Sequence, residues 1–382
     1  MDVPEIIFTC LAICLLLFCL VCAFFACLYS STRRKQGNKI RNAPPETRVT
    51  VIEEEPKVTV VPAPVIIQEE KAIKRPRNLR IETAPVMTAR SAIAIETDHA
   101  IDHFLAEMSA PTEQRRRLLD EEFQVLCSTE ARRTTKTADK ATRYRYLNRY
   151  ADIVPYDHTL VELDGEHRKY INASYVQGEH DGLRFIATQG PIGEEEGMSV
   201  TTCGDFWRMI WQQNVECVVM LTGLQENHMQ KCGRYWPKLV GTSEQFDEFR
   251  ILLISENEQG KDVIHREIDM IDTHDRRRQI SQYQYMNWMD NDAPNINTFL
   301  QFLMNIRRQK FQSPIVVHCS AGIGRTGVYI CTDNVISRIK TEHIIDIFSE
   351  VNRARQQRPS MVNTLSQYIS IYDTIALYVR NI

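Results

Sequence analysis

The ten residues from His318 to Gly327 read HCSAGIGRTG, and they decide which fold this chain can adopt. An apolar strand, Ile315–Val317, is expected directly before them, and a helix, Val328–Ile339, directly after them. A strand, a tight glycine-containing loop and a helix in this order aim backbone N–H groups and the positive end of the helix dipole at one point. The stretch therefore predicts a loop that surrounds a bound anion.

The side chains of this loop indicate chemistry on a phosphate group. Five residues separate Cys319 from Arg325, a length that can wrap one tetrahedral oxyanion, and Gly322 and Gly324 permit close backbone approaches. The positive field favours the thiolate of Cys319, which is the competent nucleophile. Arg325 can bind two phosphate oxygens with its planar fork, and the Thr326 hydroxyl can hydrogen-bond the sulfur as it leaves. The expected backbone donors are those of Ser320, Ala321, Gly322, Ile323 and Gly324.

Two other interpretations of the loop are weaker. A nucleotide-binding loop would need a Lys-Ser/Thr pair after its last glycine, and here Arg325 and Thr326 follow Gly324. A buried structural cysteine beside incidental glycines would not require an arginine at this spacing, nor a strand before and a helix after. The combination therefore favours a nucleophilic cysteine and a phosphate clamp.

The chain of 382 residues is expected to begin with a membrane anchor. Residues 6–29 carry no charge and no proline, and they are long enough to cross a hydrocarbon core of ~30 Å. A cleaved signal peptide would need basic residues before this run, where Asp2 and Glu5 stand instead. The positive-inside rule then predicts a single-pass membrane protein, in which residues 1–29 form the anchor, residues 6–29 cross the lipid bilayer and the rest is cytoplasmic. The basic residues behind that inference are Arg33, Arg34, Lys35, Lys39 and Arg41.

The remainder is predicted to form a linker and one catalytic domain. Residues 30–98 are rich in proline and charge, which is typical of an extended cytoplasmic linker, and helix and strand patterns begin at about residue 99 and continue to residue 382. The net charge of -3 argues against a nucleic-acid partner. The cysteines and histidines lack metal-site spacing, so neither a metal nor another cofactor is expected.

Several further motifs occur in a fixed order around the phosphate loop. Together with the loop they resemble the classical protein-tyrosine phosphatase family from about residue 115 to the end of the chain. The resemblance implies an α/β fold in which helices flank a highly twisted mixed sheet. It also implies hydrolysis of phosphotyrosine in proteins through a phospho-cysteine intermediate. The motifs are Asn148–Tyr150 (NRY), Tyr170–Ser174 (YINAS), Phe185–Pro191 (FIATQGP), Asp205–Trp207 (DFW) and Tyr235–Pro237 (YWP).

The resemblance also implies roles for residues outside the loop. Tyr150 would stack on the phenyl ring of the substrate and make the pocket too deep for phosphoserine, and Asp152 would hydrogen-bond the substrate backbone. Lys231 would meet a mobile loop that carries the general acid, and Glu226 would pair with Arg325. The substrates implied are phosphotyrosine-containing proteins.

The acid loop departs from the family pattern. In the segment Trp288–Pro294 the register places Asp290 at the general acid, which protonates the leaving tyrosine oxygen and then deprotonates the attacking water. Asp292 is a less suitable acid in this register. Met289 stands where the family has proline, Asn291 where it has an aromatic residue, and Asp292 where it has glycine. These changes put the closure of the loop in question.

Two other segments also differ from the family. In the water-positioning segment Asn363 replaces a glutamine, whereas Gln367 is retained. The connection Ile192–Thr201 is longer than usual and is expected to form an exposed acidic loop. The alternative function is a phosphotyrosine-binding scaffold with little or no turnover, for which the motivating residues are Met289, Asn291, Asp292 and Asn363.

Overall fold

The computed structural model describes residues 99–131, 136–165, 168–178, 183–198 and 200–382. The predicted anchor (residues 1–29) and the predicted linker (residues 30–98) lie outside these residues. Within the described part of the chain, no helix combines the length and the apolar character needed to cross a membrane.

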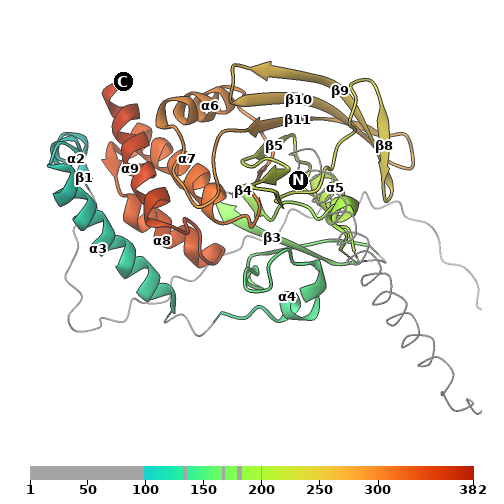
Figure 1. Cartoon of the computed structure of the whole chain (residues 1–382), viewed down its shortest axis with the longest axis horizontal. Helices are drawn as coiled ribbons and strands as arrows, with labels where there is room; N and C mark the ends of the chain where they lie inside the picture. The colour runs from blue at the N-terminus through green and yellow to red at the C-terminus, as the bar shows by residue number, and fades with distance from the viewer. Residues whose placement is uncertain (1–98, 132–135, 166–167, 179–182, 199) are drawn as a thin grey trace, which may run out of the picture. The chain divides into compact units, whose positions relative to one another are not determined.

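A nine-stranded mixed sheet forms the centre of the described residues (Figure 1). Its inner strands run parallel and its flanking strands antiparallel. In spatial order the strands are β2 (Leu160–Glu162), β3 (Tyr170–Gln177), β4 (Leu183–Thr188), β12 (Ile315–His318), β5 (Cys217–Met220), β11 (Arg277–Tyr285), β10 (Val263–Ile271), β9 (Phe249–Gln259) and β8 (Ser243–Phe246). Two short pairs accompany it: β1 (His99–Ala100) with β13 (Ile344–Ile345), and β6 (Gln225–Glu226) with β7 (Met229–Gln230).

The register of the parallel strands brings three loops to one edge of the sheet. At the end of β12, His318 pairs with Thr188 of β4 on one side and with Met220 of β5 on the other. The segments that follow these strands therefore start side by side at their carboxyl ends. This edge is where parallel sheets commonly bind ligands.

Helices cover both faces of the sheet. Figure 1 shows α2 and α3 grouped with α7, α8 and α9, and α5 contacts β3, β8 and β9. The helices are α2 (Ile101–Met108), α3 (Thr112–Ala131), α4 (Asp139–Arg143), α5 (Cys203–Gln212), α6 (Ile296–Arg308), α7 (Gly324–Glu342), α8 (Ile347–Gln357) and α9 (Leu365–Arg380). Short 3₁₀ turns occur at Arg145–Leu147 and Glu194–Glu196.

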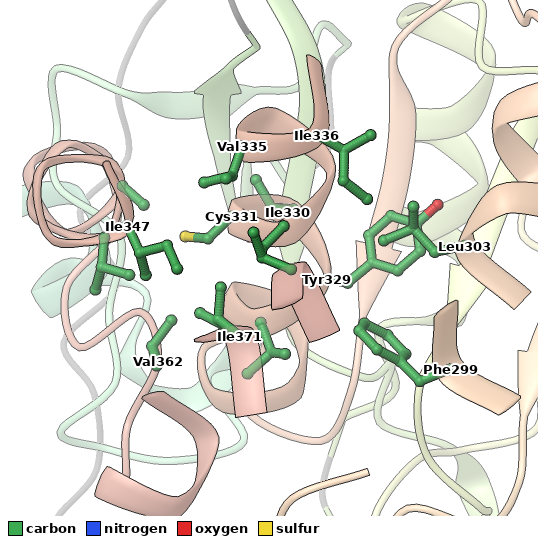
Figure 2. Packing of buried hydrophobic residues seen from close by; sticks show 14 of the residues in the cluster. Phe299, Leu303, Tyr329, Ile330, Cys331, Val335, Ile336, Ile347, Val362 and Ile371 are labelled. Carbon is green, nitrogen blue, oxygen red and sulfur yellow. The ribbon is translucent and has the colours of Figure 1, made fainter. Parts of the chain in front are cut away.

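Burial on both faces explains why the central strands are apolar throughout. Along β12, Val317 packs with the cluster around α7 and α9, and Val316 packs with the cluster around α5. In Figure 2 the side chain of Tyr329 on α7 lies beside Phe299 and Leu303 of α6, and Cys331 of α7 points toward Ile347 of α8. The predicted helix-flanked mixed sheet is confirmed.

Helix α7 begins four residues earlier than its apolar pattern indicates. The prediction started at Val328, the first apolar residue, whereas the helix starts at Gly324. Arg325 and Thr326 therefore lie in its first turn, and the free N–H groups of that turn adjoin the loop directly.

Candidate active site

The phosphate loop is a buried turn between β12 and α7. Cys319 is 3% exposed, and its sulfur accepts a hydrogen bond from the Gly322 amide at 3.3 Å. Gly322 has φ +73°, and a Cβ there would lie 2.2 Å from the Thr188 carbonyl oxygen. Only glycine satisfies both demands, so this position fixes how the chain turns beneath the sulfur.

The environment of the Cys319 sulfur favours the thiolate. Burial raises the pKa of the thiol, but the Arg325 charge and hydrogen bonds from Thr326 and Gly322 outweigh it, so the pKa lies below its ordinary value. Among the described residues the Thr326 hydroxyl has no partner in good hydrogen-bond geometry, yet it lies close enough to the sulfur to lower the pKa of Cys319. A reactive cysteine requires such an environment.

The preceding histidine is buried and neutral. Burial lowers the pKa of His318 to about 4, so the imidazole is neutral at neutral pH. Its Nε2 atom lies 2.9 Å from the Tyr235 hydroxyl, which also accepts a hydrogen bond from Gln282. These buried contacts hold the end of β12 in place.

Arg325 connects the phosphate loop with the acid loop. It is 1% exposed, and its Nη1 atom donates to Glu226 at 2.6 Å and to the Trp288 carbonyl oxygen at 2.7 Å. Its Nη2 atom lies 3.4 Å from Asp290. The buried Nε atom has no hydrogen-bond partner among the described residues, which leaves a donor for a bound oxyanion.

The acid loop brings Asp290, rather than Asp292, to the site. The Asp290 carboxylate accepts a hydrogen bond from Lys231 at 2.8 Å and faces Arg325, whereas Asp292 is exposed. Burial raises the pKa of Asp290, but the Lys231 hydrogen bond and the Arg325 charge outweigh it, so the net pKa is lowered. The structure thus brings together the residues expected to surround the acid.

Two hydroxyl groups hold the altered part of this loop. Asn291 adopts φ +60°, and its carbonyl oxygen accepts hydrogen bonds from Thr364 Oγ1 and Ser366 Oγ, each at 3.2 Å. The Trp288 indole donates to the Asp292 carbonyl oxygen at 2.7 Å and closes the turn. Met289, in the place of the proline, is 50% exposed and does not contribute to the core.

Of the two residues predicted to recognise the substrate, Tyr150 lies at the phosphate loop and Asp152 is exposed. Tyr150 lies beside the phosphate loop, with its hydroxyl 2.9 Å from Ser320 Oγ. Asp152 is exposed, two residues further on. This leaves Asp152 accessible to a peptide, but nothing in the described contacts constrains it.

The predicted water-positioning segment contains one buried and one exposed amide residue. Gln367 is 1% exposed, and a Cβ on Gly324 would lie 2.8 Å from its Nε2 atom, so this amide abuts the phosphate loop. Its Oε1 atom accepts a hydrogen bond from the Asn363 backbone at 3.0 Å. The Asn363 residue itself is exposed.

Sequence reasoning missed Arg358, which supports the phosphate loop from beneath. This fully buried side chain donates to the carbonyl oxygens of Gly322 at 2.8 Å and Ala321 at 3.0 Å, and to Asn172 Oδ1 at 2.8 Å. Burial lowers the pKa of Arg358 to about 10. Turning these carbonyls toward Arg358 leaves the amides of the loop to face an anion. No local pattern distinguishes it from the other arginines of its segment.

Comparison with known proteins agrees with this geometry. The profile of the protein-tyrosine phosphatase family matches residues 144–377. Tyrosine-protein phosphatase 69D of Drosophila melanogaster is 37% identical over 264 residues, which are 66% of this chain and 17% of that protein. Receptor-type tyrosine-protein phosphatase C of Homo sapiens is 35% identical over 240 residues, which are 60% of this chain and 18% of that protein. The chain thus spans about a sixth of the length of these relatives.

Solved structures show the same fold. The catalytic domain of human protein tyrosine phosphatase non-receptor type 18 has a TM-score of 0.65 and 31% identity, and the match covers 72% of this chain and 99% of that one. A structure of PTPN18 in complex with HER2 phosphopeptides has a TM-score of 0.68 and 31% identity, with 73% and 98% covered. The chain belongs to the protein-tyrosine phosphatase family.

Proposed function

We propose that this chain hydrolyses phosphotyrosine in proteins, with Cys319 as nucleophile, Arg325 as phosphate clamp and Asp290 as general acid and base. The observation that carries the proposal is the convergence of these three groups at the start of α7. The Cys319 pKa is lowered there, and Arg325, in the first turn, lies 3.4 Å from Asp290.

The reaction follows in two steps. The Cys319 thiolate attacks phosphorus, the bond to the tyrosine oxygen breaks, and Asp290 gives its proton to that oxygen. A water molecule then attacks the phospho-cysteine, Asp290 takes its proton, and the thiolate leaves with the hydroxyl of Thr326 beside it. Arg325 and the amides of Ser320, Ala321, Gly322, Ile323 and Gly324 hold the phosphoryl oxygens throughout.

The substrate should supply the charge that tunes the acid. Lys231 and Arg325 lower the Asp290 pKa. A phosphate dianion bound to Arg325 offsets them, so the pKa of Asp290 rises and the protonated form needed for the first step becomes populated. Tyr150 forms a side wall for the aromatic ring, Asp152 meets the substrate backbone, and Asn363 and Gln367 guide the water.

A turnover assay tests the proposal. The full chain in detergent should release phosphate from a phosphotyrosyl peptide. Cys319→Ser should abolish release while the peptide still binds, and the exposed Cys127→Ser should behave as the unmutated chain. Absence of turnover by the unmutated chain would refute the enzymatic proposal.

A phosphotyrosine-binding scaffold is the second candidate, because Asn363 is exposed and Met289 lacks the restraint of proline. It requires peptide binding with negligible phosphate release by the unmutated chain. Met289→Pro combined with Asn363→Gln should then raise turnover. If the combined change has no effect, these positions do not explain the inactivity.

We further propose that residues 1–29 anchor the chain in a membrane, that residues 30–98 link it to the catalytic domain, and that this domain spans residues 99–382 on the cytoplasmic side. Support comes from the uncharged run at residues 6–29 and the basic residues after it. The chain should resist alkaline extraction from membranes, and deletion of residues 1–29 should release it. Complete extraction of the intact chain would contradict the anchor.

A further inference from the structure

The long connection between β4 and α5 has one acidic side chain that turns inward. Residues Ile192–Thr201 were expected to form an exposed acidic loop, and Glu194 and Glu195 are exposed. The side chain of Glu196 is only 5% exposed, which corrects that expectation. A run of three glutamates cannot reveal this, because the partner of Glu196 lies far away in the sequence.

That partner is Arg149, whose side chain is also 5% exposed. Its Nη1 and Nη2 atoms donate to the two carboxylate oxygens of Glu196 at 2.5 Å and 2.7 Å. The same guanidinium donates to the carbonyl oxygens of Gly190 at 3.1 Å and Pro191 at 2.6 Å. Glu196 also accepts a hydrogen bond from the Gly193 amide at 2.8 Å. Both members of the ion pair therefore make further hydrogen bonds to the backbone of this connection.

The pair fastens the recognition segment to the phosphate loop. Tyr150, the proposed wall of the pocket, directly follows Arg149 in the chain. Gly190, which accepts from Arg149, donates its own amide to the Ser320 carbonyl oxygen at 2.8 Å, and a Cβ on Gly190 would lie 2.7 Å from the Cys319 carbonyl oxygen. Arg149, directly before Tyr150, and the backbone at Cys319 therefore both contact the same short segment at Gly190.

We infer that Glu196 is a positioning residue that holds the Tyr150 wall at the distance from the phosphate loop that fits a phenyl ring. This inference rests on the proposed function, because it assigns Tyr150 to the substrate ring. Neutralising Glu196 leaves the Arg149 charge buried without its counter-ion, and the guanidinium must then move toward water. The segment that carries Tyr150 moves with it, whereas Arg358 and Gly322 still hold the phosphate loop.

Binding measurements isolate this effect from turnover. In the full chain carrying Cys319→Ser, calorimetry gives dissociation constants for a phosphotyrosyl peptide and for inorganic phosphate. Glu196→Gln should weaken peptide binding roughly tenfold, the ratio that corresponds to the loss of one charge-assisted hydrogen bond. Phosphate binding, which needs only the loop, should not change. The matched control is Glu194→Gln, the same change at an exposed position of the same turn, and it should leave both constants unchanged.

A second comparison separates positioning from general damage. With Tyr150→Ala already present, Glu196→Gln should have no further effect on peptide binding, since it acts through Tyr150. Unchanged peptide affinity in Glu196→Gln, equal losses for peptide and phosphate, or additive losses with Tyr150→Ala would each overturn the inference. If Glu196→Gln does not fold, as judged by thermal unfolding, Glu196→Asp is subjected to the same comparisons. Absence of turnover by the unmutated chain would refute the proposed function but would leave these binding constants interpretable.

Discussion

The phosphate loop and the acid loop meet at Arg325 but are held in opposite ways. Cys319 and Arg325 are 3% and 1% exposed, and buried hydrogen bonds from Arg358 fix the loop carbonyls. In the acid loop Met289 is 50% exposed, and the Asp290 side chain is 35% exposed. Hydrogen bonds to Trp288, Asp290 and Asn291 hold this loop against the site.

The difference reflects what each loop must do. An oxyanion site works best when its donors need no rearrangement during the reaction, and burial restricts the movement of the phosphate loop. A loop that closes over a substrate must also release product, and it can do so only if few contacts are broken. Three of the residues that depart from the family pattern, Met289, Asn291 and Asp292, lie in the acid loop. There the hydroxyls of Thr364 and Ser366 donate hydrogen bonds to the Asn291 carbonyl oxygen.

The largest effect is expected for a substitution in the buried phosphate loop. Arg325→Lys keeps the charge but loses the planar fork, so we expect kcat to fall by roughly 10²–10³. Steady-state kinetics with a phosphotyrosyl peptide measures it. Arg117→Lys, at a side chain that is 82% exposed, is the control and should have no effect. Near-full activity of Arg325→Lys would mean that the rigid geometry is not required.

An intermediate effect should come from the contact that holds the acid loop. Ser366→Ala removes one hydrogen bond to Asn291. We therefore expect kcat on phenyl phosphate, whose phenolate is a poor leaving group, to fall roughly 2- to 10-fold. The fall should be smaller for p-nitrophenyl phosphate, which needs less help from Asp290. The exposed Ser128→Ala serves as control.

The same change in an Asp290→Asn background tests whether Ser366 acts through the acid. Without the acid, the position of its loop no longer matters to proton transfer, and Ser366→Ala should have no further effect on kcat. A loss that persists in this background would show that the hydroxyl supports the fold instead.

The smallest effect is expected on the pH profile. Lys231→Met removes a cation that lowers the Asp290 pKa, so that pKa rises and the protonated acid persists to higher pH. The alkaline limb of kcat should therefore move to higher pH, and only modestly, because Asp290 is partly exposed and solvent screens the pair. A shift toward lower pH would contradict the assigned contact. Initial rates measured across pH, with unfolding followed in parallel, provide the test.

Much of the site could be predicted because its signals are local. The order of strand, glycine loop and helix around Cys319, the spacing to Arg325 and the register of Asp290 are all read within a few residues. The helix start was misjudged by four residues, since Gly324 and Arg325 carry no apolar signal. Ser366 was not singled out at all, because its contact depends on where another loop lies.

The order of residues along the chain was enough to predict Cys319, Arg325 and Asp290 as the proposed nucleophile, clamp and acid, since each prediction depends on neighbours a few positions away. Only the tertiary structure showed which charged side chains, beyond Lys231 and Glu226, lie around this site. Arg358 reaches the loop from 36 residues away along the chain, and Glu196 reaches Arg149 from 47. A buried charge is costly without a partner, so the fold must place a counter-ion or a hydrogen-bond acceptor beside it. Neither composition nor periodicity shows which residue that partner is.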